Sequence, residues 1–261
     1  MTVPEPVSGA VIDTTLLDGK LKLRQLQAGH RAGTDAILLS ALVGDAIGVV
    51  VDVGAGAGAA GLSVALRNSS CDLLLAEIEP ALAAIARQNI TLNDMSGRAR
   101  VIAADILDPK SRIAAGLLDN CADILITNPP YQQAGVSRVS PDTLKARAHT
   151  FSQMAGGPKA DLDTWLRACA AMLRPGGNFA MIHRADALDE VLGACSGRFG
   201  ALEILPIYPK LNRAANRILI HGKAGSRGPV SILPGLVLHE DDGSFTARAA
   251  AIHAGQAIVN Q

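Results

Sequence analysis

The sequence has few aromatic residues, no net charge and no metal-binding motif. These shortages limit the kind of core, of nucleic-acid contact and of metal site that can be expected. Phe, Trp and Tyr together make up 3% of the 261 residues, so we expect an aliphatic core. Lys plus Arg and Asp plus Glu both number 24, so any contact with nucleic acid needs a local basic face. The six histidines show no grouping such as H-E-x-x-H, which gives a metal site no support.

Disulfides, membrane spans and signal peptides also find little support in the sequence. The four cysteines are far apart and form no C-x-x-C pair, so we expect reduced, buried thiols. The longest apolar run, residues 47–66, is interrupted by Asp52 and five glycines and does not suit a bilayer. Residues 1–15 lack a basic segment followed by an apolar one. We therefore expect a soluble, cytoplasmic protein.

The length of the chain favours one domain with extensions at both ends. We expect an N-terminal extension over residues 1–34, a main domain over 35–223, and a C-terminal tail over 224–261 that packs on the same domain. Within the extension, apolar and polar residues alternate on both sides of Asp18-Gly19, which predicts a β-hairpin.

Strands and helices alternate regularly through the main domain. Buried apolar runs predict seven strands, at residues 49–53, 72–76, 101–104, 123–127, 178–183, 202–208 and 217–221. Helical patterns occupy residues 36–43, 59–67, 80–93, 161–173 and 186–195. Thr34 or Asp35 is suited to cap the first helix. The alternation predicts an α/β fold with a mainly parallel sheet covered by helices on both faces.

Ligands of open parallel sheets bind at the carboxyl ends of the strands, so the residues at these ends are the candidates for a site. Asp52 and Gly54 end the first strand, Glu77 the second and Asp105 the third. The fourth strand stops at Asn128-Pro129-Pro130-Tyr131, because two prolines cannot donate ladder hydrogen bonds. An amide, unused carbonyls and an aromatic ring can hold a flat molecule that bears an amino group. A proline-rich turn without function is the alternative.

The glycines after the first strand indicate a nucleoside cofactor. A side chain on Gly54 or Gly56 would obstruct the approach of a ligand to the backbone. Residues 56–61 also fit the dinucleotide pattern G-x-G-x-x-G, with Glu77 lying 21 residues after Gly56, so the glycines alone leave a nicotinamide cofactor open. Asp52 suits an ammonium group better than a pyrophosphate, which favours a cofactor with an amino-acid tail.

Together these residues resemble the motifs of class I S-adenosylmethionine-dependent methyltransferases, which implies a Rossmann-like seven-stranded sheet. The resemblance covers roughly residues 28–222. Asn128-Pro-Pro-Tyr131 resembles the members that methylate amino groups of adenine or cytosine, or glutamine amides of release factors. Gly33-Thr34-Asp35-Ala-Ile-Leu-Leu further resembles the family that methylates adenine N6 in the anticodon loop of valine tRNA, some members of which are labelled predicted O-methyltransferases. An alanine-rich glycine turn and a lack of aromatics after Tyr131 depart from the pattern.

The resemblance implies that the strand ends hold S-adenosylmethionine. Gly54 and Gly56 would let its methionine part approach the backbone, with Asp52 near the ammonium group. Glu77 would accept both ribose hydroxyls, and Asp105 the adenine amino group. Two further residues would lie against the cofactor, namely Thr34 and Asn128.

The substrate half of the site is implied by the fourth strand end. Asn128 and the Pro129 carbonyl would accept the two N–H groups of the substrate amino group, and Tyr131 would stack on the base. Catalysis would then consist mainly of positioning and preorganised electrostatics.

An RNA partner is indicated by basic residues near this motif, and tRNA is the expected substrate. Four residues that follow Tyr131 are the best candidates for phosphate contacts, namely Arg138, Lys145, Arg147 and His149. Two other basic groups precede the site or lie near the end of the main domain, at residues 20–31 and 210–223. A solvated surface is the favoured explanation of any single group. Methylation of a protein glutamine, methylation of a small molecule or an oxygen, and a nucleoside- or RNA-binding module without turnover stay open.

Overall fold

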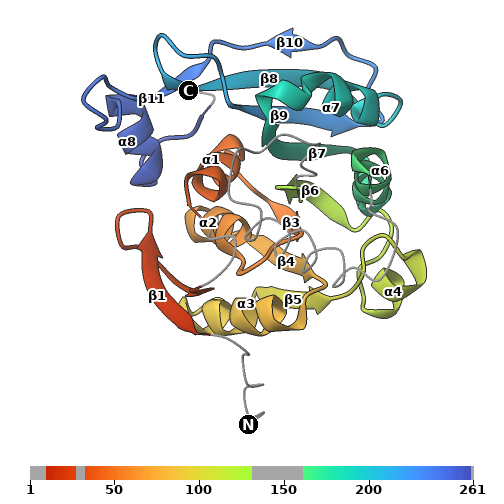
Figure 1. Ribbon diagram of the computed structural model, residues 1–261. Coiled ribbons are helices and arrows are strands. Elements are labelled where there is room, and N and C mark those ends of the chain that lie inside the picture. The colour runs from red at the N-terminus through yellow and green to blue at the C-terminus, as the bar shows by residue number, and fades with distance from the viewer. Residues whose placement is uncertain (1–9, 28–32, 131–160, 260–261) are drawn as a thin grey trace, which may run out of the picture.

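The computed structural model describes residues 10–27, 33–130 and 161–259 (Figure 1). Its main sheet confirms the predicted α/β fold with seven central strands. In spatial order these are β5 (Ala99–Ala103), β4 (Cys71–Glu77), β3 (Gly48–Val53), β6 (Ala122–Thr127), β7 (Leu173–Arg184), β9 (Arg217–Ala224) and β8 (Phe199–Lys210). Two short strands of the tail, β10 (Ser231–Ile232) and β11 (Leu236–His239), bring the sheet to nine strands.

The order of the strands places a switch point in the middle of the sheet. From β3 the chain moves outward to β4 and β5, and it then returns to β6 on the other side of β3. All these neighbours, and β6 with β7, are parallel, whereas β9 runs antiparallel to both β7 and β8. Val53 pairs with Thr127 at the carboxyl ends of β3 and β6. Ligands of such sheets bind at this point, beside the residues that follow Val53 and Thr127.

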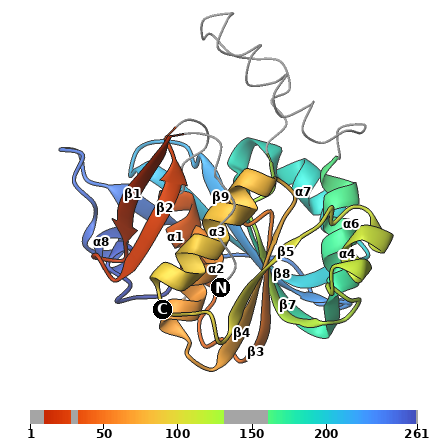
Figure 2. The same ribbon diagram turned by 90° about the horizontal axis from the view of Figure 1, so that it is seen from below.

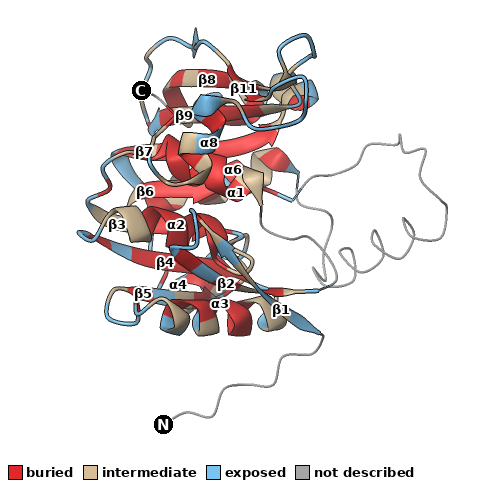
Figure 3. Ribbon diagram, turned by 90° about the vertical axis from the view of Figure 1, so that its left-hand side faces the viewer, coloured by how far each residue is buried: buried red, intermediate tan, exposed pale blue. Residues whose placement is uncertain are grey.

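Helices cover both faces of the sheet, and its central strands β3 (Gly48–Val53), β4 (Cys71–Glu77) and β6 (Ala122–Thr127) are mainly apolar. One face carries α1 (Thr34–Leu42), α2 (Ala59–Arg67) and α3 (Pro80–Leu92), and the other carries α4 (Pro109–Ala114), α6 (Leu162–Met172) and α7 (Leu188–Cys195) (Figure 2). A 3-10 turn, η1 (Ala185–Ala187), precedes α7. Successive strand residues alternate between the faces, as Val50 and Val51 do, and join two separate apolar layers. Burial is therefore concentrated in the central strands (Figure 3).

The predicted N-terminal hairpin is present as a separate two-stranded sheet. Strands β1 (Val11–Leu16) and β2 (Leu21–Leu26) pair antiparallel around a turn in which Asp18 and Gly19 have φ values of 57° and 79°. Leu21 and Leu23 of β2 point into the core and are fully buried. The hairpin lies against α3 rather than against the main sheet.

The start of α1 differs from the prediction. The helix begins at Thr34 with Gly33 at the N-cap position, and no side chain within the described residues caps it, so the expected cap by Thr34 or Asp35 is wrong. Both side chains contact other elements instead. Thr34 Oγ1 lies 3.3 Å from His253 Nε2, and Asp35 Oδ2 accepts a hydrogen bond of 3.1 Å from Arg217 Nε. These contacts hold the N-terminus of α1 at the carboxyl edge of the sheet.

The C-terminal tail packs against β8 and α1. Strands β10 and β11 both pair parallel with β8. Helix α8 (Ala247–His253) follows, and the rings of His239, Phe245 and His253 form a stack with centroid separations of 4.9 and 4.2 Å. The division into extension, main domain and tail stays a proposal.

The described segments give no sign of a bilayer span or a metal site. Within residues 10–27, 33–130 and 161–259, no helix is both long and apolar enough to cross a membrane. The same ranges hold no group of three His, Cys, Asp or Glu side chains that could bind a metal ion. The four cysteines are free thiols, and burial raises the pKa of Cys195 to about 12, so this thiol stays protonated.

Candidate active site

Four of the predicted site residues lie together at the carboxyl edge of the sheet. The pairing of Val53 with both Ala76 and Thr127 puts the ends of β4, β3 and β6 side by side. Glu77, Gly54 and Asn128 consequently occupy adjacent strand ends, and Asp105 follows the neighbouring end of β5.

The glycine turn after β3 combines helix packing with an approachable backbone. Gly54, Gly56 and Gly58 have φ values of 71°, 57° and 87°, a region that side chains other than hydrogen disfavour. A β-carbon on Gly58 would lie 2.7 Å from Leu75 Cδ1, so this glycine serves the packing of α2 on β4. A β-carbon on Gly56 would meet no atom of the described residues within 4 Å. The space beside Gly56 is therefore open, and its contact with the cofactor stays a proposal.

Glu77 is held rigidly beside this turn. Its side chain is buried, and Oε2 accepts a hydrogen bond of 2.8 Å from the Gly56 amide while Oε1 accepts one of 2.8 Å from the Glu79 amide. Burial raises the pKa of Glu77, and the two amide hydrogen bonds act in the opposite direction. Each oxygen keeps a lone pair that can accept from a ribose hydroxyl.

Asp52 links the end of β3 to the start of α2, the two elements that flank the glycine turn. Its carboxylate is buried, and Oδ2 accepts a hydrogen bond of 2.8 Å from the amide of Gly61, in the first turn of α2. Burial raises the pKa of Asp52 from 3.8 to about 7, the hydrogen bond from Gly61 lowers it, and the nearby charge of Glu77 raises it further. The structure thus gives Asp52 a partner in α2, and its contact with the cofactor ammonium group stays a proposal.

Replacing Asp52 by asparagine is expected to change how the stability of the cofactor-free protein depends on pH. The folded-state pKa of about 7 lies above the ordinary 3.8, so the stability contributed by Asp52 is full below pH 3.8 and is lost as the pH rises through 7. Asparagine still accepts from Gly61 and does not ionise. The melting temperature of Asp52→Asn relative to the wild type should therefore be highest above pH 7 and should fall steadily toward pH 4. A difference that is constant with pH would contradict this assignment.

The end of β5 and the residue after Glu77 complete the cofactor half. Asp105 is half-buried, and its Oδ1 accepts a hydrogen bond of 2.9 Å from the Leu107 amide. Ile78 is 49% exposed directly after Glu77, which the sequence analysis did not single out. We expect this side chain to cover a face of the cofactor adenine. The sequence pattern that could have identified Ile78 is an apolar residue between two glutamates, Glu77 and Glu79, at the end of a strand.

A tryptophan within the helix expected at residues 161–173 links the two halves of the site. Trp165 of α6 donates from Nε1 to Thr127 Oγ1 at 3.0 Å, and Thr127 Oγ1 donates to the Val53 carbonyl at 2.9 Å. The indole ring would lie 3.1 Å from a β-carbon on Gly54. Asn128 directly follows Thr127, so this chain of contacts holds the strand end that carries Asn128 against the start of the glycine turn.

Replacing Trp165 by phenylalanine is expected to lower turnover about 5- to 10-fold, as the loss of one buried hydrogen bond would at a site that depends on geometry. The KM for the cofactor should change less than about 2-fold, because Glu77 keeps its hydrogen bond to the Gly56 amide. The measurement is steady-state kinetics with methyl-labelled cofactor. Since Trp165 is the only tryptophan, its emission in the wild type should also change on cofactor binding. An unchanged turnover number would remove Trp165 from the site.

The remaining predicted residues are placed less completely. Pro129 is buried behind Asn128. Tyr131 and the four basic residues expected to contact RNA lie outside the described residues, namely Arg138, Lys145, Arg147 and His149.

The basic group at residues 210–223 is split by the fold. Lys210 ends β8 and Arg217 begins β9, both at the carboxyl edge where the site lies. Lys223 pairs with Asn178, near the opposite edge, because β9 runs antiparallel to β7.

Comparison with known proteins shows which family the chain belongs to. Residues 31–150 match the family described as methyltransferase small domain. The tRNA1(Val) (adenine(37)-N6)-methyltransferase of Aeromonas hydrophila is 30% identical over 223 residues, which cover 84% of this chain and 86% of that protein. The release factor glutamine methyltransferase of Chlorobaculum tepidum is 25% identical over 164 residues, 63% of this chain and 55% of that protein.

A solved structure shows the same fold. The crystal structure of a predicted O-methyltransferase from Agrobacterium tumefaciens is 32% identical, has a TM-score of 0.70, and is matched over 86% of this chain and 97% of that one. The fold and the matches define the chain as a methyltransferase that depends on S-adenosylmethionine, which confirms the predicted enzyme class and cofactor. Within that class it belongs to the family that contains the tRNA1(Val) (adenine(37)-N6)-methyltransferases.

Proposed function

We propose that this protein methylates the exocyclic N6 of an adenine in tRNA, in the cytoplasm. The observation that carries the proposal is the position of Asn128 beside Gly54, set by the pairing of Val53 with Thr127. In the proposed reaction the Asn128 amide would accept from a planar amino group beside the turn assigned to the cofactor. The family relationship to tRNA adenine-N6 methyltransferases supports RNA as the source of that amino group.

The chemistry follows from hydrogen bonding at the end of β6. When bound, S-adenosylmethionine supplies an electrophilic methyl group on a sulfonium. Asn128 Oδ1 and the Pro129 carbonyl accept the two N–H groups, which raises the electron density on nitrogen and turns its lone pair out of conjugation with the ring. Methyl transfer would form the N–C bond as the S–C bond breaks, with S-adenosylhomocysteine as the leaving group, and the surplus proton would then pass from nitrogen to solvent. Positioning and fixed dipoles therefore carry the catalysis.

A protein glutamine is the second candidate substrate. A glutamine amide also presents a planar NH2 group, and the release factor glutamine methyltransferase of Chlorobaculum tepidum is 25% identical to this chain. A hydroxyl has a single hydrogen and would use one of the two acceptors at Asn128 and Pro129, so the geometry favours nitrogen over oxygen.

The deciding experiment offers both substrates to the full chain. Labelled methyl groups would be supplied with total tRNA from a strain that lacks this enzyme and, separately, with unmodified release factor. We expect label in tRNA, with N6-methyladenosine identified by nucleoside mass spectrometry. Label confined to release factor would overturn the tRNA proposal and favour the glutamine reaction.

A further inference from the structure

The glycine turn has an anchor that lies outside all the sequence motifs of the site. Asn89 of α3 is fully buried and donates from Nδ2 to the Ala57 carbonyl at 2.9 Å. On the other side of the turn, the Gly54 amide donates to Ala76 O at 3.0 Å and the Gly56 amide to Glu77. Strand β4 therefore holds the amide side of the turn, and α3 holds its carbonyl side.

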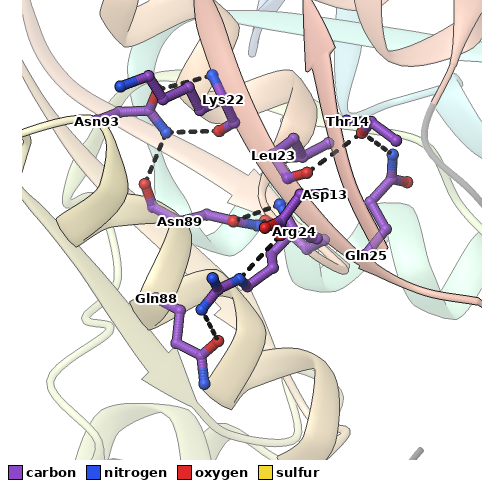
Figure 4. Close-up of polar contacts among 10 residues, drawn as sticks. Asp13, Thr14, Lys22, Leu23, Arg24, Gln25, Gln88, Asn89 and Asn93 are labelled. Atoms are coloured by element: carbon purple, nitrogen blue, oxygen red, sulfur yellow. Dashed lines mark hydrogen bonds and ion pairs between the residues drawn. The ribbon is translucent and has the colours of Figure 1, made fainter. Parts of the chain in front are cut away.

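The same side chain binds the N-terminal hairpin (Figure 4). Asn89 Oδ1 accepts from the Arg24 amide at 2.7 Å, and Asn89 Nδ2 donates to the Arg24 carbonyl at 3.0 Å. One helical turn later, Asn93 makes the same pair of bonds to the amide and carbonyl of Lys22, at 3.0 and 2.7 Å. Lys22 and Arg24 are alternate residues of β2, so their main-chain groups face the same way. Two amides on α3 thus take the place of a third strand at the edge of the hairpin.

Asn89 differs from Asn93 in one respect that bears on the cofactor. Both donor hydrogens of Asn89 Nδ2 are used, one by the hairpin at Arg24 and one by the glycine turn at Ala57. The second partner of Asn93 Nδ2 is the Asn89 carbonyl in its own helix, at 2.8 Å. The plane of the Asn89 amide is therefore set jointly by the hairpin and the turn, whereas Asn93 serves the hairpin alone.

We propose that Asn89 is a positioning residue for cofactor binding and couples the N-terminal hairpin to the glycine turn. With the hairpin in place, the amide plane of Asn89 is fixed and the Ala57 carbonyl is held, so the turn is preorganised before the cofactor arrives. The coupling works equally in the opposite direction, because linked equilibria are reciprocal. Cofactor that orders the turn therefore tightens the hairpin. The proposal rests on the cofactor role assigned to the turn and is independent of which substrate is methylated.

The test compares Asn89→Ala with Asn93→Ala in the full chain, by calorimetry with S-adenosylmethionine and with S-adenosylhomocysteine. Asn89→Ala is expected to weaken both ligands about 5- to 10-fold, the effect of one lost hydrogen bond to the site. Asn93→Ala removes the two bonds to Lys22 but leaves Asn89 bound to both Arg24 and Ala57, so its affinities should stay within about 2-fold. At saturating cofactor, turnover by Asn89→Ala should approach the wild-type value. Equal affinity losses in the two variants, or none in either, would overturn the role of Asn89.

A second measurement uses the wild-type protein and decides the matter if Asn89→Ala does not fold. Amide exchange is followed by NMR with and without S-adenosylhomocysteine. The Arg24 amide, bound by Asn89, should gain more protection from the ligand than the Lys22 amide, bound by Asn93. Equal protection at the two amides would show that no coupling passes through Asn89. If the ligand fails to bind at all, the cofactor assignment itself fails, which is a distinguishable result.

Discussion

Replacing Asn128 by alanine is expected to lower turnover at least ~100-fold, the size of effect seen when a contact made in the transition state is removed. Alanine takes away the oxygen that accepts an N–H of the substrate amino group, so the lone pair stays conjugated with the ring. Cofactor affinity should change less than about 3-fold, because the glycine turn and Glu77 keep their contacts. Single-turnover kinetics and calorimetry measure the two quantities separately.

A matched control for Asn128→Ala lies at the other end of the sheet. Asn178 pairs with Ile124 at the start of the parallel strands β6 and β7, far from the carboxyl edge. Asn178→Ala should leave turnover near the wild-type value. Unchanged turnover in Asn128→Ala would remove Asn128 from the mechanism, and an equal loss in both variants would point to a general loss of structure.

Replacing Glu77 by alanine is expected to weaken cofactor binding at least ~100-fold. The ribose would lose two hydrogen bonds to a charged acceptor, each worth about 1.5–3 kcal/mol. The Gly56 amide would also lose its partner, which loosens the turn that receives the methionine part. Calorimetry with S-adenosylmethionine measures the change. The matched control is Glu79→Ala, which removes a neighbouring carboxylate but keeps the backbone amide that donates to Glu77.

The ionisation of Glu77 adds a pH test to the same experiment. Burial raises its pKa, so protonation in the acid range begins earlier than for an exposed glutamate. The neutral acid is the weaker acceptor. Wild-type affinity should therefore fall as the pH drops through the raised pKa, and Glu77→Ala should lack this part of the pH dependence. A wild-type affinity that is flat over the acid range would contradict the role of Glu77.

The sequence was most informative where one physical rule governs many residues. A strand buried on both faces is apolar at most positions, so β3, β4 and β6 could be predicted from their composition. Parallel strands must end at one edge, so the residues collected from successive strand ends could be expected to meet. Gly54 and Asn128 do meet there, through a pairing between segments 74 residues apart.

Sequence reasoning failed where a side chain bonds to a distant segment of the chain. Asn89 and Trp165 resemble ordinary helix residues, since their partners at Ala57 and Thr127 are fixed only by the packing of helix on sheet. The expected helix cap at Thr34 failed for a related reason. The tail brings His253 to that hydroxyl, and a capping pattern contains no information about such a contact.

The short strands of the tail have a consequence for self-association. β8 is the last long strand of the sheet, and its outer edge would present a row of unpaired main-chain groups to solution. Strands β10 and β11 cover that edge in parallel register from Glu203 to Lys210. An uncovered strand edge is a template for pairing with another molecule. Removing residues 225–261 should therefore produce concentration-dependent aggregates in light scattering, even where the methyl-transfer site is intact, and a truncated chain that stays monodisperse would contradict this. The tail, remote in sequence from every catalytic motif, would protect the fold from edge-to-edge aggregation.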